Sequence, residues 1–442
     1  MNYTIYPRPL SGVINAPSSK SIMHRVLICA SFSHGNTIIE SPLYCYDTLM
    51  TMKALENIGV TFKKDDNKLI VYPPKQYKLH TDYIECGNSA STIRFLMPLY
   101  TKLFNSVVFK GDERLMKRIE TEDLTEMPFE YYIQNNTITV SNIRTINNIT
   151  IHNHNTSQLI SGLLLYISII SKKNSIHLVT NNNELDPYIE LTLDVLANFG
   201  VVSEITHQDN LFTISINKHL TSIEDSFGRP TLKSCHYYIE GDYSSASNML
   251  ALGLLGDNVI VKNLFKTSKQ GDKAFIKILE SMDAEFQIGI DAVRAIKSNL
   301  TKTEIDLTYN PDLGPLLMGI ASVSKGTTSI INYERLTLKE SNRLTETINI
   351  LKSLGANIEI KDDTILIHGK PMLEGGVTVD PINDHRLLMM IVALTNKYQE
   401  RVTILNAECV NKSYPTFWED YRKLKGVAVV SSTDEIMRGN NE

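Results

Sequence analysis

The sequence lacks the features that mark secreted disulfide-rich proteins, zinc proteins and membrane proteins. Its five cysteines are an odd number, lie scattered along 442 residues and form no C-x-x-C pair, so we expect reduced, mostly buried thiols. The longest nearly apolar stretch, Leu159 to Ile170, is shorter than the roughly 20 residues of a membrane-spanning helix. We predict that it forms a buried helix, and we expect no membrane partner.

An excess of positive charge is also missing. The chain has 44 lysines and arginines against 49 aspartates and glutamates, a formal net charge of -5. Proteins that bind the nucleic-acid backbone usually carry a basic excess, so nucleic acid is not an expected partner and any anionic ligand must meet local cations. The first residues show no basic region followed by an apolar run, and a cytoplasmic location is therefore expected.

The usual motifs of nucleotide and metal sites do not occur. The sequence contains no G-x-x-x-x-G-K-[ST], no G-x-G-x-x-G and no H-E-x-x-H, so nucleotide, dinucleotide and zincin chemistry lack their common support. His152-Asn153-His154 has the spacing of a metal pair, but no third ligand lies near it in the sequence, and the alternation of a strand explains it. An anion site without a metal is the class that remains.

The length and the hydrophobic pattern predict two α/β domains. A chain of 442 residues exceeds one ordinary core. Six segments share a polar opening, an apolar stretch rich in small residues, a turn and a β-branched run, and each is predicted to be a helix, a turn and a strand. These segments are Ser21 to Glu40, Ser91 to Phe109, Ser157 to Val179, Ser244 to Val261, Leu313 to Ile331, and His385 to Leu405.

Most of these segments are followed by a second predicted helix with one apolar face, a glycine stop and a β-hairpin. The stops Gly59, Gly200 and Gly355 stand where a helix end favours a left-handed residue. Between Arg118 and Val140 the glycine stop is missing and a proline occurs, so this helix is predicted to be short or absent. Six units of this kind imply two domains of three.

The chain is expected to pass between the two domains twice. The strand at Ile5 and the stretch from Ser226 to Lys233, which contains a glycine and a proline, are the predicted crossing points. Domain I is predicted to comprise residues 1–14 and 234–442, and domain II residues 15–233.

Polar and charged residues gather where the predicted buried helices begin, and there free backbone N–H groups and the helix dipole attract anions. The first start, Ser18 to Ser21 with Arg25, offers two cations and three hydroxyls. The turn Gly87 to Arg94 and the group Asn155 to Gln158 offer small residues and further hydroxyls. An ordinary serine cap is the simpler explanation of any single start, but the recurrence favours anion binding.

Other helix starts and loops carry carboxylates or further cations. The acidic start Glu240 to Ala246 is predicted to be a cap or a hinge, and Asp312 is either a cap or a base. A single histidine is more often structural, but His385 stands between Asp384 and Arg386. Cations also occur in the groups Lys339 to Arg343 and Asn411 to Pro415. In the first group, Lys339 and Arg343 are four positions apart and would share a helical face.

Seven ordered motifs carry a family resemblance over almost the full chain: SSKSIMHR, GNSASTIR, TSQLISGLL, EGDYSSAS, RLTLKESNRL, DHRLLMM and NKSYPTFW. The sequence resembles the EPSP synthases, or 3-phosphoshikimate 1-carboxyvinyltransferases. The resemblance implies an α/β, two-domain enolpyruvyl transferase fold in which each domain has three repeated βαβαββ-like units, with buried parallel helices and outward-facing sheets. It implies transfer of the enolpyruvyl group of phosphoenolpyruvate to the 5-hydroxyl of shikimate 3-phosphate, by a monomer without a metal or an organic cofactor.

The resemblance also implies roles for single residues. Contacts to shikimate 3-phosphate are implied for Lys20, Ser21, Arg25, Thr156, Ser157, Gln158, Asp312 and Lys339. Contacts to phosphoenolpyruvate are implied for Lys20, Asn88, Ala90, Arg118, Gln158, Arg343, Arg386 and Lys412. Asp312 is similar in position to the carboxylate proposed as base for the 5-hydroxyl. Lys339 and Glu340 match the pair expected to handle the proton at the methylene carbon.

Three positions depart from the family pattern. Ala90 replaces the second glycine of G-N-A-G-T, and its added methyl is expected to weaken binding of glyphosate, which is longer than phosphoenolpyruvate. Ile119 follows Arg118 where proline is usual, and Leu185 stands where serine is common. The placement of Arg118 and one phosphate contact therefore follow less directly from the resemblance.

Two other functions fit part of the pattern. The sister enolpyruvyl transferase that acts on UDP-N-acetylglucosamine commonly uses a loop cysteine as acid, but the corresponding residues Gly111 to Ile119 contain none. The presence of Asp312, Lys339, Glu340 and Arg386 argues against a binding or scaffold protein with the same fold. Shikimate 3-phosphate is therefore the expected acceptor.

Overall fold

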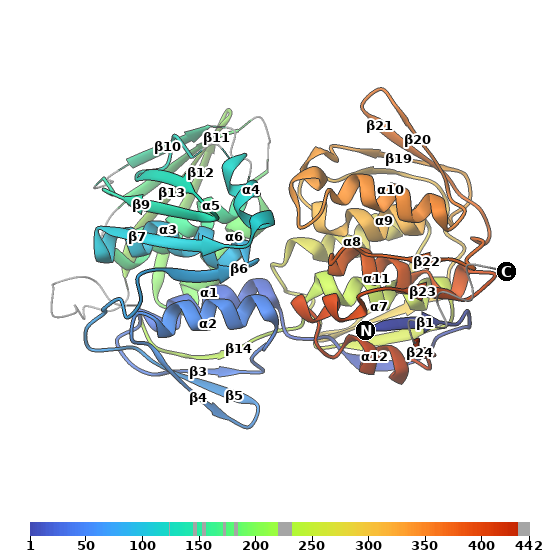
Figure 1. Cartoon of the computed structure of the whole chain (residues 1–442), viewed down its shortest axis with the longest axis horizontal. Coiled ribbons are helices and arrows are strands. Elements are labelled where there is room, and N and C mark those ends of the chain that lie inside the picture. The colour runs from blue at the N-terminus through green and yellow to red at the C-terminus, as the bar shows by residue number, and fades with distance from the viewer. Residues whose placement is uncertain are drawn as a thin grey trace. The chain divides into compact units, whose positions relative to one another are not determined.

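The structure is a computed structural model that describes residues 1–122, 124–144, 148–152, 156–170, 174–180, 184–219 and 232–431. The chain forms two compact units, unit 1 with Met1–Pro17 and Glu240–Glu442, and unit 2 with Ser18–Ile239 (Figure 1). The sequence analysis placed the crossings after residues 14 and 233. Residues 226–231 of the expected second crossing lie outside the described residues.

Unit 2 contains three four-stranded sheets of one topology. In each sheet the first two strands are parallel and the other neighbours are antiparallel. In sheet order the strands are β14 (His236–Tyr238), β3 (Thr37–Glu40), β5 (Lys68–Tyr72) and β4 (Thr61–Asp65); β6 (Ile84–Gly87), β7 (Ser106–Gly111), β9 (Thr137–Ser141) and β8 (Glu130–Gln134); and β10 (Asn148–His152), β11 (Asn174–Val179), β13 (Leu211–His219) and β12 (Val201–Gln208). Burial alternates along strands such as β5, because successive side chains point to opposite faces.

The helices of unit 2 pack inside and around these sheets (Figure 1). They are α1 (Lys20–Ser31), α2 (Tyr46–Glu56), α3 (Ala90–Phe104), α4 (Glu113–Glu120), α5 (Ser157–Ile170) and α6 (Pro187–Asn198). The helices α3 and α5 approach closely at Gly162, where a Cβ atom would collide with the carbonyl of Arg94. Because of this close approach, the first turns of the two helices exchange side-chain contacts.

Unit 1 also contains three four-stranded sheets, with the same order of one parallel pair followed by antiparallel neighbours. Listed from the parallel pair, the strands are β22 (Thr378–Val379), β23 (Val402–Ile404), β1 (Asn2–Ile5) and β24 (Ala428–Ser431); β2 (Gly12–Asn15), β15 (Val259–Lys262), β17 (Ala292–Ile296) and β16 (Glu285–Ile288); and β18 (Glu304–Asp306), β19 (Thr327–Ile331), β21 (Thr364–His368) and β20 (Asn357–Lys361). The first strand of the chain thus completes a sheet with strands from its C-terminal part.

The helices of unit 1 include three that are buried along their whole length. All residues of α7 (Tyr243–Leu255), α9 (Gly314–Ala321) and α11 (His385–Ala393) are buried, as expected for helices that are apolar nearly all round. The others are α8 (Ala274–Glu280), α10 (Arg343–Ser353) and α12 (Phe417–Lys423), with the 3-10 helices η1 (Gly271–Lys273), η2 (Pro311–Leu313), η3 (Glu334–Leu338), η4 (Thr395–Lys397) and η5 (Ala407–Lys412).

The elements agree with the order predicted from the sequence. Each of the six predicted segments contains a helix followed by a strand. The glycine stops Gly59, Gly200 and Gly355 have φ angles of 96°, 85° and 95°, the left-handed conformation that glycine adopts without strain. The prediction for the stretch after Arg118 is also confirmed, because the described residues between α4 and β8 form no helix. The helix α4 itself was not predicted.

The apolar stretch near Leu159 lies in α5, whose described side chains from Leu159 to Ile169 are buried. All five cysteines are free, and three of them are buried. Within the described ranges, no helix combines the length and the apolar composition that crossing a bilayer requires.

Candidate active site

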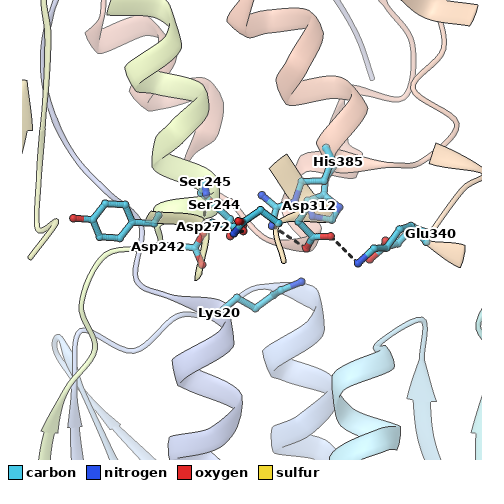
Figure 2. A network of polar contacts seen from close by, with 12 residues as sticks. Lys20, Asp242, Ser244, Ser245, Asp272, Asp312, Glu340 and His385 are labelled. Carbon is cyan, nitrogen blue, oxygen red and sulfur yellow. Dashed lines mark hydrogen bonds and ion pairs between the residues drawn. The ribbon is translucent and has the colours of Figure 1, made fainter. Parts of the chain in front are cut away.

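Four elements of unit 1 bring ionisable side chains together. Asp312 is the middle residue of η2, Lys339 follows η3, Arg343 begins α10 and Arg386 lies in the first turn of α11. Figure 2 shows Asp312 between Glu340 on one side and the acidic residues Asp242 and Asp272 on the other. The sequence analysis named Asp312, Lys339, Arg343 and Arg386, although the first and the last of these residues lie 74 positions apart in the chain.

Asp312 is paired with three cations. Its Oδ1 lies 3.0 Å from Lys339 Nζ and 3.0 Å from Arg343 Nη1, and its Oδ2 lies 3.6 Å from Arg386 Nη2. The carboxylate is 33% exposed, whereas the side chains of Arg343 and Arg386 are 1% and 7% exposed. Asp312 does not cap α9, whose N-terminus has no side-chain cap, so the alternative of a helix cap does not apply.

Arg343 is the centre of this cluster, which we call the carboxylate–arginine cluster (Asp312, Lys339, Glu340, Arg343, Asp384 and Arg386). Its Nε donates to Asp384 Oδ2 at 2.9 Å, and its Nη2 donates to Glu340 Oε2 at 2.6 Å and to Asp384 Oδ1 at 3.2 Å. Asp384 is fully buried and also caps α11 by accepting from the Arg386 backbone N–H at 2.9 Å. The guanidinium therefore faces three carboxylates in fixed directions.

The pairing determines the charge states of the cluster. Burial by itself would raise the pKa of Asp312, but Lys339, Arg343 and Arg386 together hold that pKa well below its usual range. Burial opposes the charge of Arg343 as well, yet Asp384, Glu340 and Asp312 raise its pKa above the usual value. Burial lowers the pKa of Lys339, an effect that Asp312 partly offsets. At neutral pH, Asp312 is therefore an ionised carboxylate.

Arg386 keeps hydrogen-bonding capacity toward a ligand. Its Nε and Nη1 are buried and have no hydrogen-bond partner among the described residues. Buried guanidinium donors are rarely left unsatisfied, so these atoms indicate a place for an oxygen ligand. Lys412, the last residue of η5, is 7% exposed, and the buried hydroxyl of its neighbour Ser413 also lacks a partner within the described part of the chain.

In unit 2, the first turn of α1 carries the predicted lysine and serines. Ser19 caps the helix by accepting from the Ile22 backbone N–H at 3.4 Å, so one serine of the group has the capping role that was the simpler alternative. Lys20 Nζ lies 2.7 Å from Asp47 Oδ2, and the two side chains are 16% and 5% exposed. Asp47, in the first turn of α2, was not singled out from the sequence.

Arg25 is buried among neutral oxygens. Its Nε donates to Thr192 Oγ1 at 2.7 Å, and its Nη2 donates to Ser161 Oγ and to the Tyr188 carbonyl, each at 3.1 Å. Its Nη1 donates to the Ser21 carbonyl at 2.8 Å, and the guanidinium lies over the Phe95 ring at 4.8 Å from the centroid. Burial, only partly offset by Tyr188 and Asp186, lowers the pKa of Arg25 to about 10.

The turn before α3 is formed by Gly87, Asn88 and Ser89. Gly87 has a φ angle of 53°, and a Cβ atom there would collide with the Tyr46 hydroxyl, so glycine is needed for this turn. Ser89 precedes α3 without a side-chain cap bond, and Ala90 is the first helical residue, with 8% exposure. The methyl group of Ala90 is therefore nearly buried at a helix start.

The third predicted start lies at α5. Thr156 Oγ1 accepts from the Gln158 backbone N–H at 3.2 Å, and the side chain of Ser157 is buried. Gln158 Oε1 accepts from Arg94 Nη1 at 2.6 Å, and its Nε2 donates to Ser91 Oγ at 3.1 Å. His154 and Asn155, which the sequence analysis named, lie outside the described residues. Among the described residues, no group of three His, Cys, Asp or Glu side chains is placed to hold a metal ion.

Two departures from the family pattern fall on structured residues. Ile119 is fully buried within α4 and its neighbour Arg118 is half-buried. The α4 N-terminus is capped by Asp112, which accepts from the Leu115 backbone N–H at 2.7 Å. Leu185 is buried and directly precedes Asp186, the cap of α6. The contacts implied for Arg118 and for the Leu185 region stay predictions.

Several residues of these clusters were missed from the sequence. Asp384 was seen only as a neighbour of His385, Asp272 was not singled out, and Arg94 was seen only as part of a small-residue turn. Arg94 is 3% exposed and forms an ion pair with Glu122, which is 8% exposed. A charged residue within an otherwise apolar run, as in FLMPLY after Arg94, is a signal that would have found it.

Buried cations at helix starts within an α/β fold are the arrangement expected of a protein that binds small anions. The family model described as EPSP synthase (3-phosphoshikimate 1-carboxyvinyltransferase) matches residues 6–421. The chain therefore belongs to the EPSP synthase family.

Relatives with the name 3-phosphoshikimate 1-carboxyvinyltransferase match nearly the whole chain. The protein from Clostridium kluyveri is 34% identical over 429 residues, covering 96% of this chain and 97% of its own length. The protein from Clostridioides difficile is 32% identical with the same coverage, 96% and 97%. The solved EPSP synthase structure from Acinetobacter baumannii has a TM-score of 0.75 at 21% identity and covers 97% of this chain and 100% of its own, which shows that the fold is shared.

Proposed function

We propose that the protein transfers the enolpyruvyl group of phosphoenolpyruvate to the 5-hydroxyl of shikimate 3-phosphate and releases phosphate. The single observation that supports this most is Asp312, a carboxylate held ionised beside Lys339 and Arg343 at 3.0 Å each. Membership of the family and the printed names of the relatives point to the same reaction. A cytoplasmic location and a monomeric state stay predictions.

In this proposal Asp312 binds the acceptor and takes the proton of its 5-hydroxyl. The low pKa of Asp312 keeps it ionised at neutral pH, and its partial exposure, 33%, leaves room for a ligand hydroxyl. A base held by fixed cations needs little reorganisation as charge moves in the transition state. The new bond forms between the acceptor oxygen and carbon 2 of phosphoenolpyruvate.

Proton transfer at the methylene carbon is assigned to Lys339 and Glu340. Addition of the hydroxyl requires a proton at carbon 3, and elimination of phosphate removes a proton from the same carbon. Burial lowers the pKa of Lys339, which makes its ammonium group a better proton donor. Glu340 Oε2 is 2.6 Å from Arg343, so it is a carboxylate held in a fixed position.

The anionic groups of the substrates are assigned to the remaining predicted residues. Arg343, Arg386 and Lys412 in unit 1, and Lys20, Asn88, Ala90, Arg118 and Gln158 in unit 2, are proposed to hold phosphoenolpyruvate. The unpartnered Nε and Nη1 of Arg386 support its part of this assignment, because buried guanidinium donors need oxygen acceptors such as those of a carboxylate or a phosphate. Lys20, Ser21, Arg25, Thr156, Ser157 and Gln158 are proposed to hold shikimate 3-phosphate, together with Asp312 and Lys339.

The test is phosphate release from phosphoenolpyruvate by the purified protein, with shikimate 3-phosphate or UDP-N-acetylglucosamine as acceptor. Release only with shikimate 3-phosphate is the expected result. The variant Asp312→Asn should lower kcat by about 10²- to 10⁴-fold, the contribution typical of a general base. Release with the nucleotide sugar would select the sister activity, and no release with either acceptor would leave a binding role.

Asp306→Asn is the matched control for this variant. Asp306 is an exposed carboxylate of the same unit and accepts from the Thr308 backbone N–H at 2.8 Å. Its replacement should leave kcat unchanged. An equal loss of rate in both variants would argue that Asp312 acts on the fold of unit 1 and not on the reaction.

A further inference from the structure

A buried aspartate, Asp272, acts electrostatically on Asp312 and has no part in the reaction proposed above. Asp272, in η1, is 1% exposed. Its Oδ2 accepts a hydrogen bond from the Ser244 hydroxyl, and its Oδ1 accepts from Asn310 Nδ2 at 3.3 Å. Figure 2 shows Asp272 beside Ser244, toward the start of α7. A buried carboxyl is costly unless its oxygens are hydrogen-bonded, so the bonds to Ser244 and Asn310 hold Asp272 in a defined position.

The position of Asp272 is fixed independently of Asp312. Gln270, which precedes η1 and is 6% exposed, accepts from the Tyr243 backbone N–H at 3.2 Å and donates to the Gly241 carbonyl at 2.7 Å. These bonds attach η1 to the start of the fully buried helix α7. The backbone of η1, and with it Asp272, is therefore held against α7 without any contribution from Asp312.

Asn310 connects this anchor to the proposed base. It directly precedes η2, and its carbonyl accepts from the Leu313 backbone N–H at 3.0 Å, so it closes the turn that contains Asp312. Asn310 is 7% exposed. A change in its side-chain position would move this turn, and with it the Asp312 carboxylate.

We propose that Asp272 is a positioning residue that holds the Asp312 turn through the Asn310 amide. The proposal rests on the transferase function proposed above. The charged groups that act on Asp272 are Asp312 from η2 and Arg386 from α11. Burial, and then the charge of Asp312, raise the pKa of Asp272, so of the two carboxyls Asp312 is the one that stays ionised more firmly.

The test uses the full chain and compares Asp272→Ala with Asp272→Asn. Alanine removes the acceptor for Asn310, whereas asparagine retains an oxygen for Asn310 and can donate its amide to the Ser244 hydroxyl. We expect Asp272→Ala to weaken binding of shikimate 3-phosphate, measured by calorimetry, and to lower kcat, each by up to about 100-fold. Asp272→Asn should rescue both to within about 3-fold of wild type. Equal losses in the two variants would assign the effect to charge and overturn the proposal.

A double-mutant cycle separates positioning from a general effect on the fold. If Asp272 acts through Asp312, then Asp272→Ala should change the Kd for shikimate 3-phosphate by less than about 3-fold when Asp312 is already asparagine. The same loss in both backgrounds would show a merely structural role. The cycle needs only binding, so it can be measured even where the rate is too low to follow.

Asn310→Ala removes the donor of the hydrogen bond between Asn310 and Asp272. It therefore tests the same contact if Asp272→Ala does not fold. It should reproduce the loss in Kd and in kcat while Asp272 remains in place. Asp283→Asn is the control, because this exposed carboxylate of the same unit accepts a single hydroxyl bond, from Thr301 at 2.5 Å. Wild-type values in Asn310→Ala and in Asp272→Ala would overturn the inference, whereas an inactive wild type would instead refute the proposed function.

Discussion

Two nearly fully buried arginines, one in each unit, differ in what surrounds them. Arg343 in unit 1 faces Asp312, Glu340 and Asp384, and its pKa is raised although burial opposes its charge. Arg25 in unit 2 is held by hydroxyl and carbonyl oxygens, and burial lowers its pKa to about 10. Their exposed fractions, 1% and 2%, are almost equal. The difference therefore comes from their partners and not from depth.

The comparison teaches how each unit uses a buried positive charge. In unit 1 the carboxylates offset the charges of the cations, so the cluster fixes the direction and ionisation of Asp312. In unit 2 neutral oxygens position Arg25, and its positive charge is only partly compensated, by Tyr188 and Asp186, which suits an incoming phosphate dianion. We infer that unit 1 supplies the acid–base chemistry and that the Arg25 region supplies affinity.

The largest effect is expected from Asp384→Ala, which removes a carboxylate that compensates the charge of Arg343. The variant leaves Arg343 buried without its main partner, at 2.9 Å from Nε. Breaking a buried pair in this way costs about 3 to 5 kcal/mol of unfolding free energy. Trp418 is the only tryptophan and lies in unit 1, so its fluorescence during urea unfolding reports on that unit.

Asp380→Ala is the control for that measurement. Asp380 is exposed and accepts from the Ile382 backbone N–H at 2.8 Å. Its loss should change the unfolding free energy by about 0.5 kcal/mol or less, as for most surface substitutions. A loss for Asp384→Ala that is no larger than this would mean that the carboxylate–arginine cluster does not stabilise unit 1.

The pH dependence of the unfolding free energy tests whether Asp384 and Arg343 form an ionised pair. Arg343, acting against burial, lowers the pKa of Asp384 in the folded state, so the stability that Asp384 contributes is present above its unfolded pKa of about 3.9. That contribution is lost as the pH falls through the lower, folded value. The difference in unfolding free energy between wild type and Asp384→Asn should be constant from about pH 7 to 5 and shrink below about pH 4. An equal difference at pH 7 and at pH 3 would contradict the assignment of the ionised pair.

Arg25→Met removes the arginine that has no carboxylate as a direct partner, and it should change ligand affinity more than stability. No carboxylate loses a direct partner, and the Thr192 hydroxyl still lies 2.8 Å from Ser161 Oγ. The unfolding free energy, followed by circular dichroism, should therefore change by less than about 2 kcal/mol, because apolar replacement of a buried charge is often neutral. The Kd for shikimate 3-phosphate should rise at least tenfold, about 1.4 kcal/mol.

Arg94→Met provides the matched case within unit 2. Arg94 is also buried, but it pairs with Glu122, which is 8% exposed. Its replacement strands a nearly buried carboxylate and should cost more stability than Arg25→Met. If Arg25→Met proved the more destabilising of the two, the distinction between charged and neutral partners would fail.

The sequence predicted the elements better than it predicted the pairings. Helix and strand periods are local, so the six segments and the glycine stops were visible in the sequence. The eight residues of α4 are too few to show a helical period clearly. Asp384 pairs with Arg343, 41 positions away, and Asp272 contacts Asn310, 38 positions away. No local pattern encodes such a partner, because it depends on which helix starts the fold brings together.

The smallest effect concerns Ala90, at the start of α3 in unit 2. Its side chain is 8% exposed, and in the proposed phosphoenolpyruvate site the methyl group would occupy space that a longer ligand needs. Wild type is expected to be weakly inhibited by glyphosate, and Ala90→Gly should lower the inhibition constant about tenfold, or 1.4 kcal/mol. The KM for phosphoenolpyruvate should change less, since the shorter substrate does not reach the methyl group.

Ala274→Gly, at the start of α8 in unit 1, is the control for the cost of placing glycine in a helix, about 1 kcal/mol. A low inhibition constant in the wild type would show that the methyl group does not limit the site.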